Sequence, residues 1–153
     1  MLNLLSLTWL VVFLALALGS GYGIGLMARE SVWTTQLAVP WFSPPGWMFA
    51  PVWFAMDICL AVAGWREWAR RPKSLAIGLW FAQLALTWLW AMVFFAMGMA
   101  DLSFAVILGT LAALGGLIVT AFRIDAFSSG LLVPNFVWLA FLSVVNLAIV
   151  LMN

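Results

Sequence analysis

Long apolar runs separated by short polar stretches dominate this chain. A bilayer core of about 30 Å requires about 20 consecutive apolar residues in a helix. Five segments meet this requirement, at residues 4–27, 47–65, 74–99, 102–122 and 130–152. The pattern therefore predicts an all-α integral membrane protein, in which five transmembrane helices form one bundle and a single domain over residues 1–153. The first run lacks a basic region before it and is too long for a signal peptide, so we interpret it as a retained helix.

The connection between the first two predicted helices differs from the other three. It covers residues 28–46, whereas the others are short, and it contains Trp33, Trp41, Phe42 and three prolines. Prolines restrict the backbone and prevent a regular helix at this point. We therefore expect a semi-rigid aromatic loop that acts as a lid between helices one and two.

Composition agrees with a membrane location and excludes several classes of function. The chain is 67% hydrophobic and only 7% charged, whereas an average soluble domain is about 25% charged. Its outer surface must therefore face lipid. A net charge of +1 offers no basic surface for nucleic acid. With no histidine and one cysteine, we expect no metal site and no internal disulfide.

The basic residues predict an orientation. Five of the six lie on the side of the N-terminus, and only Arg29 lies on the other side; the five are Arg66, Arg70, Arg71, Lys73 and Arg123. Under the positive-inside rule, the N-terminus of this multi-pass protein would be cytoplasmic in a bacterial inner membrane. The aromatic loop and the C-terminus would then lie outside.

Three predicted helices carry polar and aromatic residues at helical spacing. These stripes are Phe49, Trp53 and Asp57; Gln83, Thr87, Trp90 and Phe94; and Asn135, Trp138, Leu142 and Asn146. Polar side chains are costly against lipid, so we expect these faces to turn inward. They would line a pocket of flat aromatic rings with a few polar groups, which suits a planar ligand. The alternative for Gln83, Thr87 and Asn146 is a structural hydrogen bond between helices.

Tryptophans near helix ends usually belong to the interfacial belt. We expect this of Trp9, Trp65, Trp68 and Trp80. The first helix also contains two GxxxG pairs, Gly19 with Gly23 and Gly21 with Gly25. Such pairs permit close helix approach, either within the bundle or between subunits.

Asp57 is the one carboxylate well inside a predicted span, and no basic residue lies at membrane depth to pair with it. Burial without a cation favours the neutral acid. An ionisable residue at this depth is a functional candidate. The alternative is a protonated side chain that donates a hydrogen bond to a carbonyl or to Asn135.

Three ordered motifs resemble the translocator protein family (TspO/MBR), whose members are also called tryptophan-rich sensory proteins. The first motif is the PWFSPPGW segment at residues 40–47, followed by Pro51, Val52 and Trp53. The second is Gln83 and Leu84 with Trp88, Trp90, Phe94 and Phe95. The third is the LLVP segment at residues 131–134 with Trp138 and Asn146.

The resemblance implies a five-helix bundle, usually a homodimer, with a cavity closed by the first loop. Its ligands would be tetrapyrroles such as protoporphyrin IX and other hydrophobic small molecules, with no required cofactor. By position, Trp33 would lie at the cavity mouth, Trp53 and Trp138 would face the porphyrin, and Trp90 would form a wall. With the stripes above, the predicted ligand-binding set is Trp33, Phe49, Trp53, Asp57, Thr87, Trp90, Phe94, Asn135, Trp138 and Leu142.

The leading prediction is thus a membrane receptor, sensor or translocator for porphyrin-like ligands. One alternative is light-dependent degradation of the bound tetrapyrrole, with Trp53 and Trp138 as the catalytic candidates, so enzymatic activity stays open. The other is a proton-coupled small-molecule transporter centred on Asp57. Departures from the family pattern fall on this site. Asp57 and Asn135 replace tyrosines and Thr87 replaces an asparagine, so one wall is more polar.

Overall fold

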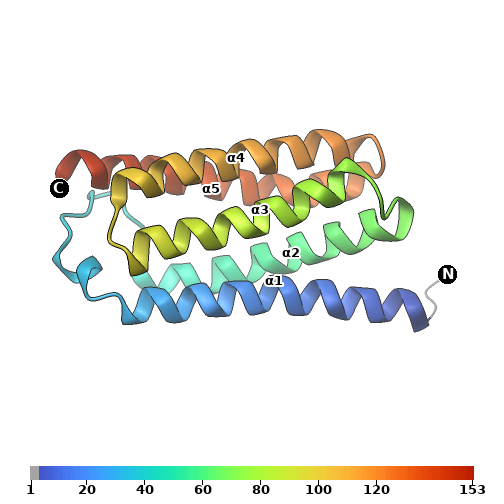
Figure 1. The fold of residues 1–153 in the computed structure, drawn as a ribbon, viewed down its shortest axis with the longest axis horizontal. Helices are drawn as coiled ribbons and strands as arrows, with labels where there is room; N and C mark the ends of the chain where they lie inside the picture. Colours follow the sequence, from blue (N-terminus) through green and yellow to red (C-terminus); the bar gives the residue numbers. More distant parts are fainter. Residues whose placement is uncertain (1–3) are drawn as a thin grey trace.

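The computed structural model describes residues 4–153, and this part of the chain is helical with no strand. The main helices are α1 (Leu4–Glu30), α2 (Gly46–Arg70), α3 (Leu75–Ala91), α4 (Ala100–Phe122) and α5 (Ala126–Met152). All five, α3 together with the π-helical turn η2 (Met92–Ala96), are long and apolar enough to cross a membrane. Figure 1 shows them side by side along one long axis, with successive helices running in opposite directions. The predicted five-helix transmembrane bundle is confirmed.

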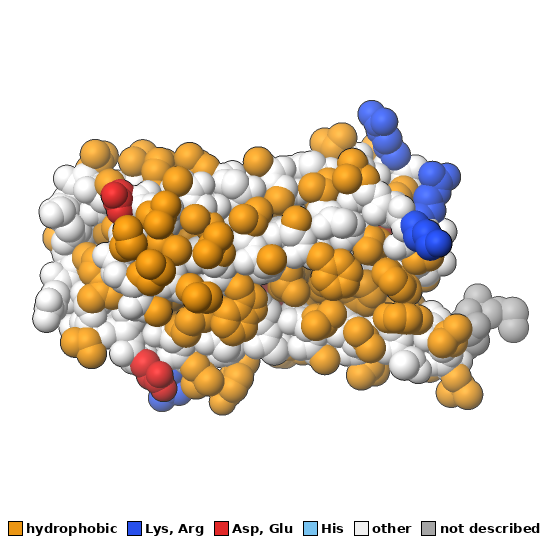
Figure 2. Space-filling view, in the orientation of Figure 1, with side chains coloured by type: hydrophobic (Ala, Val, Ile, Leu, Met, Phe, Trp, Pro, Cys, Tyr) orange, Lys and Arg blue, Asp and Glu red, His pale blue; other side chains and the backbone are white. Residues whose placement is uncertain are grey.

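Several helices extend beyond the predicted apolar runs. Helix α2 continues to Arg70 rather than residue 65, α1 continues to Glu30, and α5 begins at Ala126 rather than residue 130. An apolar run measures only the part of a helix that faces hydrocarbon, whereas backbone hydrogen bonds continue through charged residues at the interface. The space-filling view shows the same division, with hydrophobic side chains along the length and most of the visible basic ones gathered at one end (Figure 2).

The helices contact one another mainly as α1 with α2, α2 with α5, α5 with α4, and α4 with α3. The turn between η2 and α4 is short because Gly98 adopts a φ of 66°, a left-handed conformation that side chains other than glycine disfavour. This turn places α3 and α4 antiparallel and adjacent, as the sequence predicts.

Trp80 corrects the prediction of an interfacial belt. It is fully buried, its Nε1 donates a hydrogen bond to the carbonyl of Leu60 at 2.9 Å, and its ring meets that of Phe13 at 4.8 Å. Gly64 on α2 leaves the space that these two rings fill. A tryptophan near a helix end therefore packs in the core here, because a glycine opposite it makes room.

The four glycines of α1 divide by their surroundings into packed and open positions. This division does not follow the two GxxxG pairs of the sequence. A Cβ on Gly21 would collide with Asp57 and Trp53 of α2, and a Cβ on Gly23 would collide with Trp88 of α3. Gly19 and Gly25 are exposed, and a Cβ added to either would meet no atom of another described helix within 4 Å. Gly21 and Gly23 therefore serve close packing inside the bundle.

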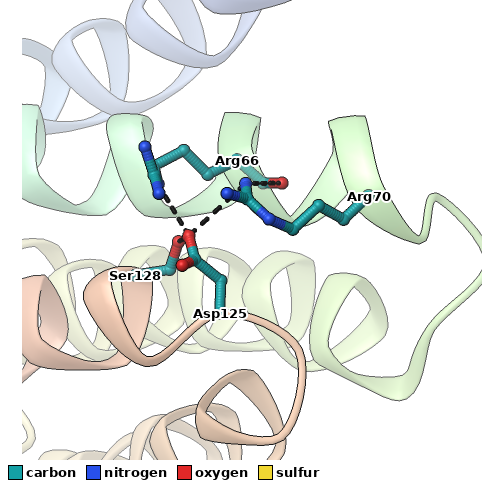
Figure 3. Close-up of polar contacts among 4 residues, drawn as sticks. All are labelled: Arg66, Arg70, Asp125 and Ser128. Carbon is teal, nitrogen blue, oxygen red and sulfur yellow. Dashed lines mark hydrogen bonds and ion pairs between the residues drawn. The ribbon is translucent and has the colours of Figure 1, made fainter.

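An ionic cluster joins α2 to the start of α5 (Figure 3). Asp125 accepts a hydrogen bond from Nε of Arg66 at 2.6 Å, lies 3.4 Å from Arg70, and also accepts from Ser128. The hydrogen bond from Arg66 is the main cause that lowers the pKa of Asp125 to about 2. Its carboxylate therefore stays charged and ties the two helices together at the basic end.

The loop between α1 and α2 lies across the opposite end of the bundle, as the predicted lid should (Figure 1). It contains the short helix η1 (Trp33–Gln36). Trp33 Nε1 donates to the carbonyl of Phe94 at 2.6 Å, and the amide of Asn153 pairs with the backbone of Ala38. Trp41 takes no part in this closure, since 95% of it is exposed. The first half of the loop is thus held to the bundle by a few hydrogen bonds.

Candidate functional site

Aromatic rings from α2, α3 and η2 form a continuous stack inside the bundle. The rings of Trp53 and Trp90 lie 6.2 Å apart with an interplanar angle of 12°, and those of Trp90 and Phe94 lie 5.8 Å apart at 17°. Spacing of three to four residues places Trp90 and Phe94 on one face of their helix. Trp53, which belongs to α2, completes the stack.

Asn146 holds the middle of this stack in place. Its Oδ1 accepts hydrogen bonds from Trp90 Nε1 at 3.1 Å and from Ser103 at 3.0 Å, and its Nδ2 donates to the carbonyl of Ala100. All its polar atoms are therefore engaged with α3 and α4. This matches the structural alternative for Asn146, in which the amide links helices.

Trp138 occupies a different position from its expected partner Trp53. Its ring contacts Phe49 at 5.9 Å and Phe141 at 5.8 Å, and it makes no ring contact with Trp53. Its buried Nε1 has no hydrogen-bond partner among the described residues. A buried indole N–H usually finds a partner, so this group is available to a ligand.

A small internal cavity lies between these aromatic side chains. Its volume is about 40 Å³, which is room for about one water molecule. Five of the ten predicted ligand-binding residues line it: Trp53, Asp57, Thr87, Asn135 and Trp138. The other lining residues are Ser20, Met56, Leu60, Gln83, Leu84, Leu114 and Leu139.

The remaining predicted residues do not line this cavity. Phe49, Trp90, Phe94 and Leu142 pack around it, while Trp33 lies in a separate depression at the lid end of the bundle. Helical spacing of polar residues did not predict that Ser20 and Leu114 line the cavity, because α1 and α4 carry no polar stripe. Ser20 follows the first glycine of α1, and the Gly21 contact with Asp57 brings that helix face to the cavity.

Asp57 has no hydrogen bond or ion pair within the part of the chain that the structure describes, and it is only 7% exposed. No lysine or arginine lines the cavity. The described residues also contain no group of three or more histidine, cysteine or acidic side chains that could hold a metal ion. The site can therefore bind a ligand through aromatic surface, amides and one carboxyl group.

A larger hollow of about 590 Å³ lies at the basic end of the bundle, lined partly by Arg71, Lys73 and Arg123. It is an open surface depression between the α2–α3 connection and the end of α4. None of the aromatic stripe residues reaches it, so we place the candidate site at the smaller internal cavity.

Known proteins with similar sequences agree on one family. The model of the TspO/MBR family matches residues 5–152. The chain is 28% identical to a tryptophan-rich sensory protein of Cereibacter sphaeroides, covering 84% of this chain and 80% of that protein. It is 29% identical to the human translocator protein, over 87% and 82% of the two chains. It is 30% identical to the tryptophan-rich protein TspO of Archaeoglobus fulgidus, over 94% and 96%. A match over almost the whole length, carried by the same helices that form the cavity, means that this chain belongs to the TspO/MBR family.

Proposed function

We propose that this membrane protein is a receptor, sensor or translocator that binds tetrapyrrole-like hydrophobic ligands at the internal cavity. One observation carries the proposal: Trp53 of α2 and Trp138 of α5 line the same buried space. Two indole rings on facing helices offer flat apolar surface on either side of a planar ligand. The names of the relatives, which include sensory and translocator proteins, support the same role.

The cavity must widen for such a ligand to enter. Sites for drug-sized ligands usually measure about 300–1,000 Å³, whereas this one measures about 40 Å³. The lid is tied by side-chain hydrogen bonds from Trp33 and Ser31 to the carbonyls of η2 and by the pairing of Asn153 with Ala38. Each such bond contributes about 0.5–1.5 kcal/mol, so ligand stacking can offset their loss.

Titration with protoporphyrin IX tests the proposal, with quenching of tryptophan fluorescence as the readout. Trp53→Phe and Trp138→Phe keep an aromatic ring but reduce the stacking surface, so each should weaken binding. Trp65→Phe is the matched control, because Trp65 lies near the basic end, where its Nε1 donates to the carbonyl of Ser6. Equal binding by all three variants and the parent would contradict the proposed site.

The two alternative functions have separate readouts in the same preparation. Light-dependent loss of the porphyrin absorption band, abolished by Trp138→Phe, would favour degradation of the ligand. Uptake of a small molecule into proteoliposomes that requires a proton gradient and Asp57 would favour transport.

We also propose that the protein is a homodimer, which crosslinking in the membrane tests.

A further inference from the structure

Around the internal cavity, the side-chain amide nitrogens have hydrogen-bond partners, whereas the amide oxygens do not. Thr87 donates its hydroxyl hydrogen to the carbonyl of Gln83 at 2.9 Å. Its Oγ1 can then only accept, and it accepts from Nε2 of Gln83 at 3.2 Å. With the hydroxyl hydrogen on that carbonyl, exchanging the two ends of the amide would place two acceptors together, so the network favours this orientation. Oε1 of Gln83 is left buried with no partner in the described chain.

Asn135 is arranged in the same way. Its Nδ2 donates to the backbone carbonyl of Met56 at 3.1 Å. A carbonyl can only accept, so the amide cannot be reversed. Oδ1 of Asn135 is therefore the atom left buried without a partner among residues 4–153. Both Gln83 and Asn135 are more than nine-tenths buried.

Asp57 also lines the cavity with its carboxyl group, whose Oδ2 lies against Gly21 of α1. It lies on α2, and the facing elements contribute Ser20 of α1, Gln83 and Thr87 of α3, and Asn135 of α5. None of these groups carries a positive charge. The donors left over are neutral, namely the Ser20 hydroxyl, the Trp138 indole and the carboxyl hydrogen of Asp57 in its neutral form, which a bound cation would displace. The cavity is thus rich in acceptors and contains no cation.

We infer that this cavity binds the protonated nitrogen of a hydrophobic amine, with the apolar part of the ligand against Trp53 and Trp138. The inference rests on the proposed function, since it names the ligand class of the same site. An ammonium group offers several N–H donors and a positive charge to the oxygens of Asp57, Gln83 and Asn135. Such hydrogen bonds are stronger than neutral ones. The nearby indole rings also attract a cation through their faces.

A negatively charged ligand group does not suit this cavity. A carboxylate would place acceptors against the oxygens of Gln83 and Asn135 and leave both unpaired, and it would repel Asp57 in its charged form. The acidic side chains of a porphyrin would therefore have to lie elsewhere, toward the lid. Among hydrophobic ligands of similar size, the cavity selects a cation over a neutral molecule and a neutral molecule over an anion.

Three probes with one ring system test this order: 2-naphthylmethylamine, 2-naphthylmethanol and 2-naphthoate. Binding is measured by calorimetry at pH 7 to the full chain in phosphatidylcholine nanodiscs, whose lipids carry no net charge. We expect the amine to bind at least about tenfold more tightly than the alcohol, and the naphthoate most weakly. Asp57→Asn should reduce amine affinity about tenfold and leave the alcohol unchanged. Asp101→Asn, at an exposed carboxylate at the start of α4, should change neither.

Asn135→Leu gives a second measurement if Asp57→Asn does not fold. It removes the unpartnered Oδ1 while keeping the branched shape of the side chain, and it should reduce the preference for amine over alcohol. Protoporphyrin IX is titrated in parallel with every variant. If porphyrin binds but the parent shows no preference for the amine, or if both cavity variants keep that preference, this inference is overturned and the proposed function stands. If neither porphyrin nor the naphthyl probes bind to the folded parent, both fail.

Discussion

Gly64 lies where α2 passes closest to two buried aromatic rings, and it offers a direct test of the packing. A Cβ at this position would lie 2.5 Å from Nε1 of Trp80 and 2.7 Å from Cδ1 of Phe13. Real Cβ atoms do not approach other atoms this closely, so something must move. Both rings are fully buried and cannot swing outward. Gly64→Ala therefore has to push α2 away from α1 and α3.

The expected cost follows from two terms. Forcing an extra methyl group into a well-packed core costs about 1–3 kcal/mol. Alanine is also favoured over glycine inside a helix by about 1 kcal/mol, which acts in the opposite direction. Displacing Trp80 threatens its hydrogen bond to Leu60, worth about 0.5–1.5 kcal/mol. The collision thus makes the substitution destabilising, and loss of the Trp80 hydrogen bond would increase the cost.

Gly78→Ala is the matched control, because it is the same substitution in α3 at an exposed position with nothing near the added methyl group. The helix-propensity term is shared, so the difference between the variants isolates the collision, and we expect it to be about 1–3 kcal/mol. Reversible unfolding in mixed micelles, followed by circular dichroism, measures it. If Gly64→Ala is as stable as Gly78→Ala, the described packing of Trp80 and Phe13 is wrong.

Three further predictions concern the polar contacts. Asn146→Leu should destabilise the bundle by about 1–2 kcal/mol, because the Trp90 indole loses its acceptor and hydrogen bonds in membranes average about 0.6 kcal/mol each; micelle unfolding checks this, and an unchanged midpoint would contradict it. Asp125 has a folded pKa of about 2, below its ordinary 3.8, so its contribution is present above about pH 4 and is lost as pH falls toward 2. Melting curves at several pH values should therefore show a smaller acid loss for Asp125→Asn than for the parent. Trp33→Phe removes the hydrogen bond that seats the lid, so trypsin should cleave faster after Arg29, and equal cleavage rates would show that this bond does not hold the loop.

The sequence predicts the number of helices because each helix that spans a bilayer needs a long apolar run, and their alternating directions follow from the succession of spans. It does not predict which tryptophans are buried. Trp80 and Trp65 both lie near helix ends, yet Trp80 is fully buried and Trp65 only partly. The difference comes from Gly64, which faces Trp80 from another helix. A contact between distant parts of the chain has no signal in the local pattern.

The local sequence pattern also predicts the lining of the candidate site only in part. Helical spacing correctly brings Asp57, Thr87 and Asn135 to one cavity, because polar groups in a span avoid lipid. The same stripes also contain Trp90 and Phe94, which stack on each other instead of lining it. A stripe extends over three helical turns, whereas a cavity of about 40 Å³ borders only one or two. Spacing therefore identifies the face but not the depth at which the cavity lies.

This chain differs from the family pattern at Asp57, Thr87 and Asn135. All three contribute to the polarity of the cavity. Asp57 contributes a carboxyl group, and Asn135 an oxygen that no protein group uses. Thr87 acts indirectly, since its hydroxyl fixes the amide of Gln83 with the oxygen left over. Trp53 and Trp138, which supply aromatic surface, are retained. Because the aromatic surface is kept while the polar atoms change, the proposed preference of this cavity for a cation is one that the resemblance alone does not imply. The three naphthyl probes measure that preference directly.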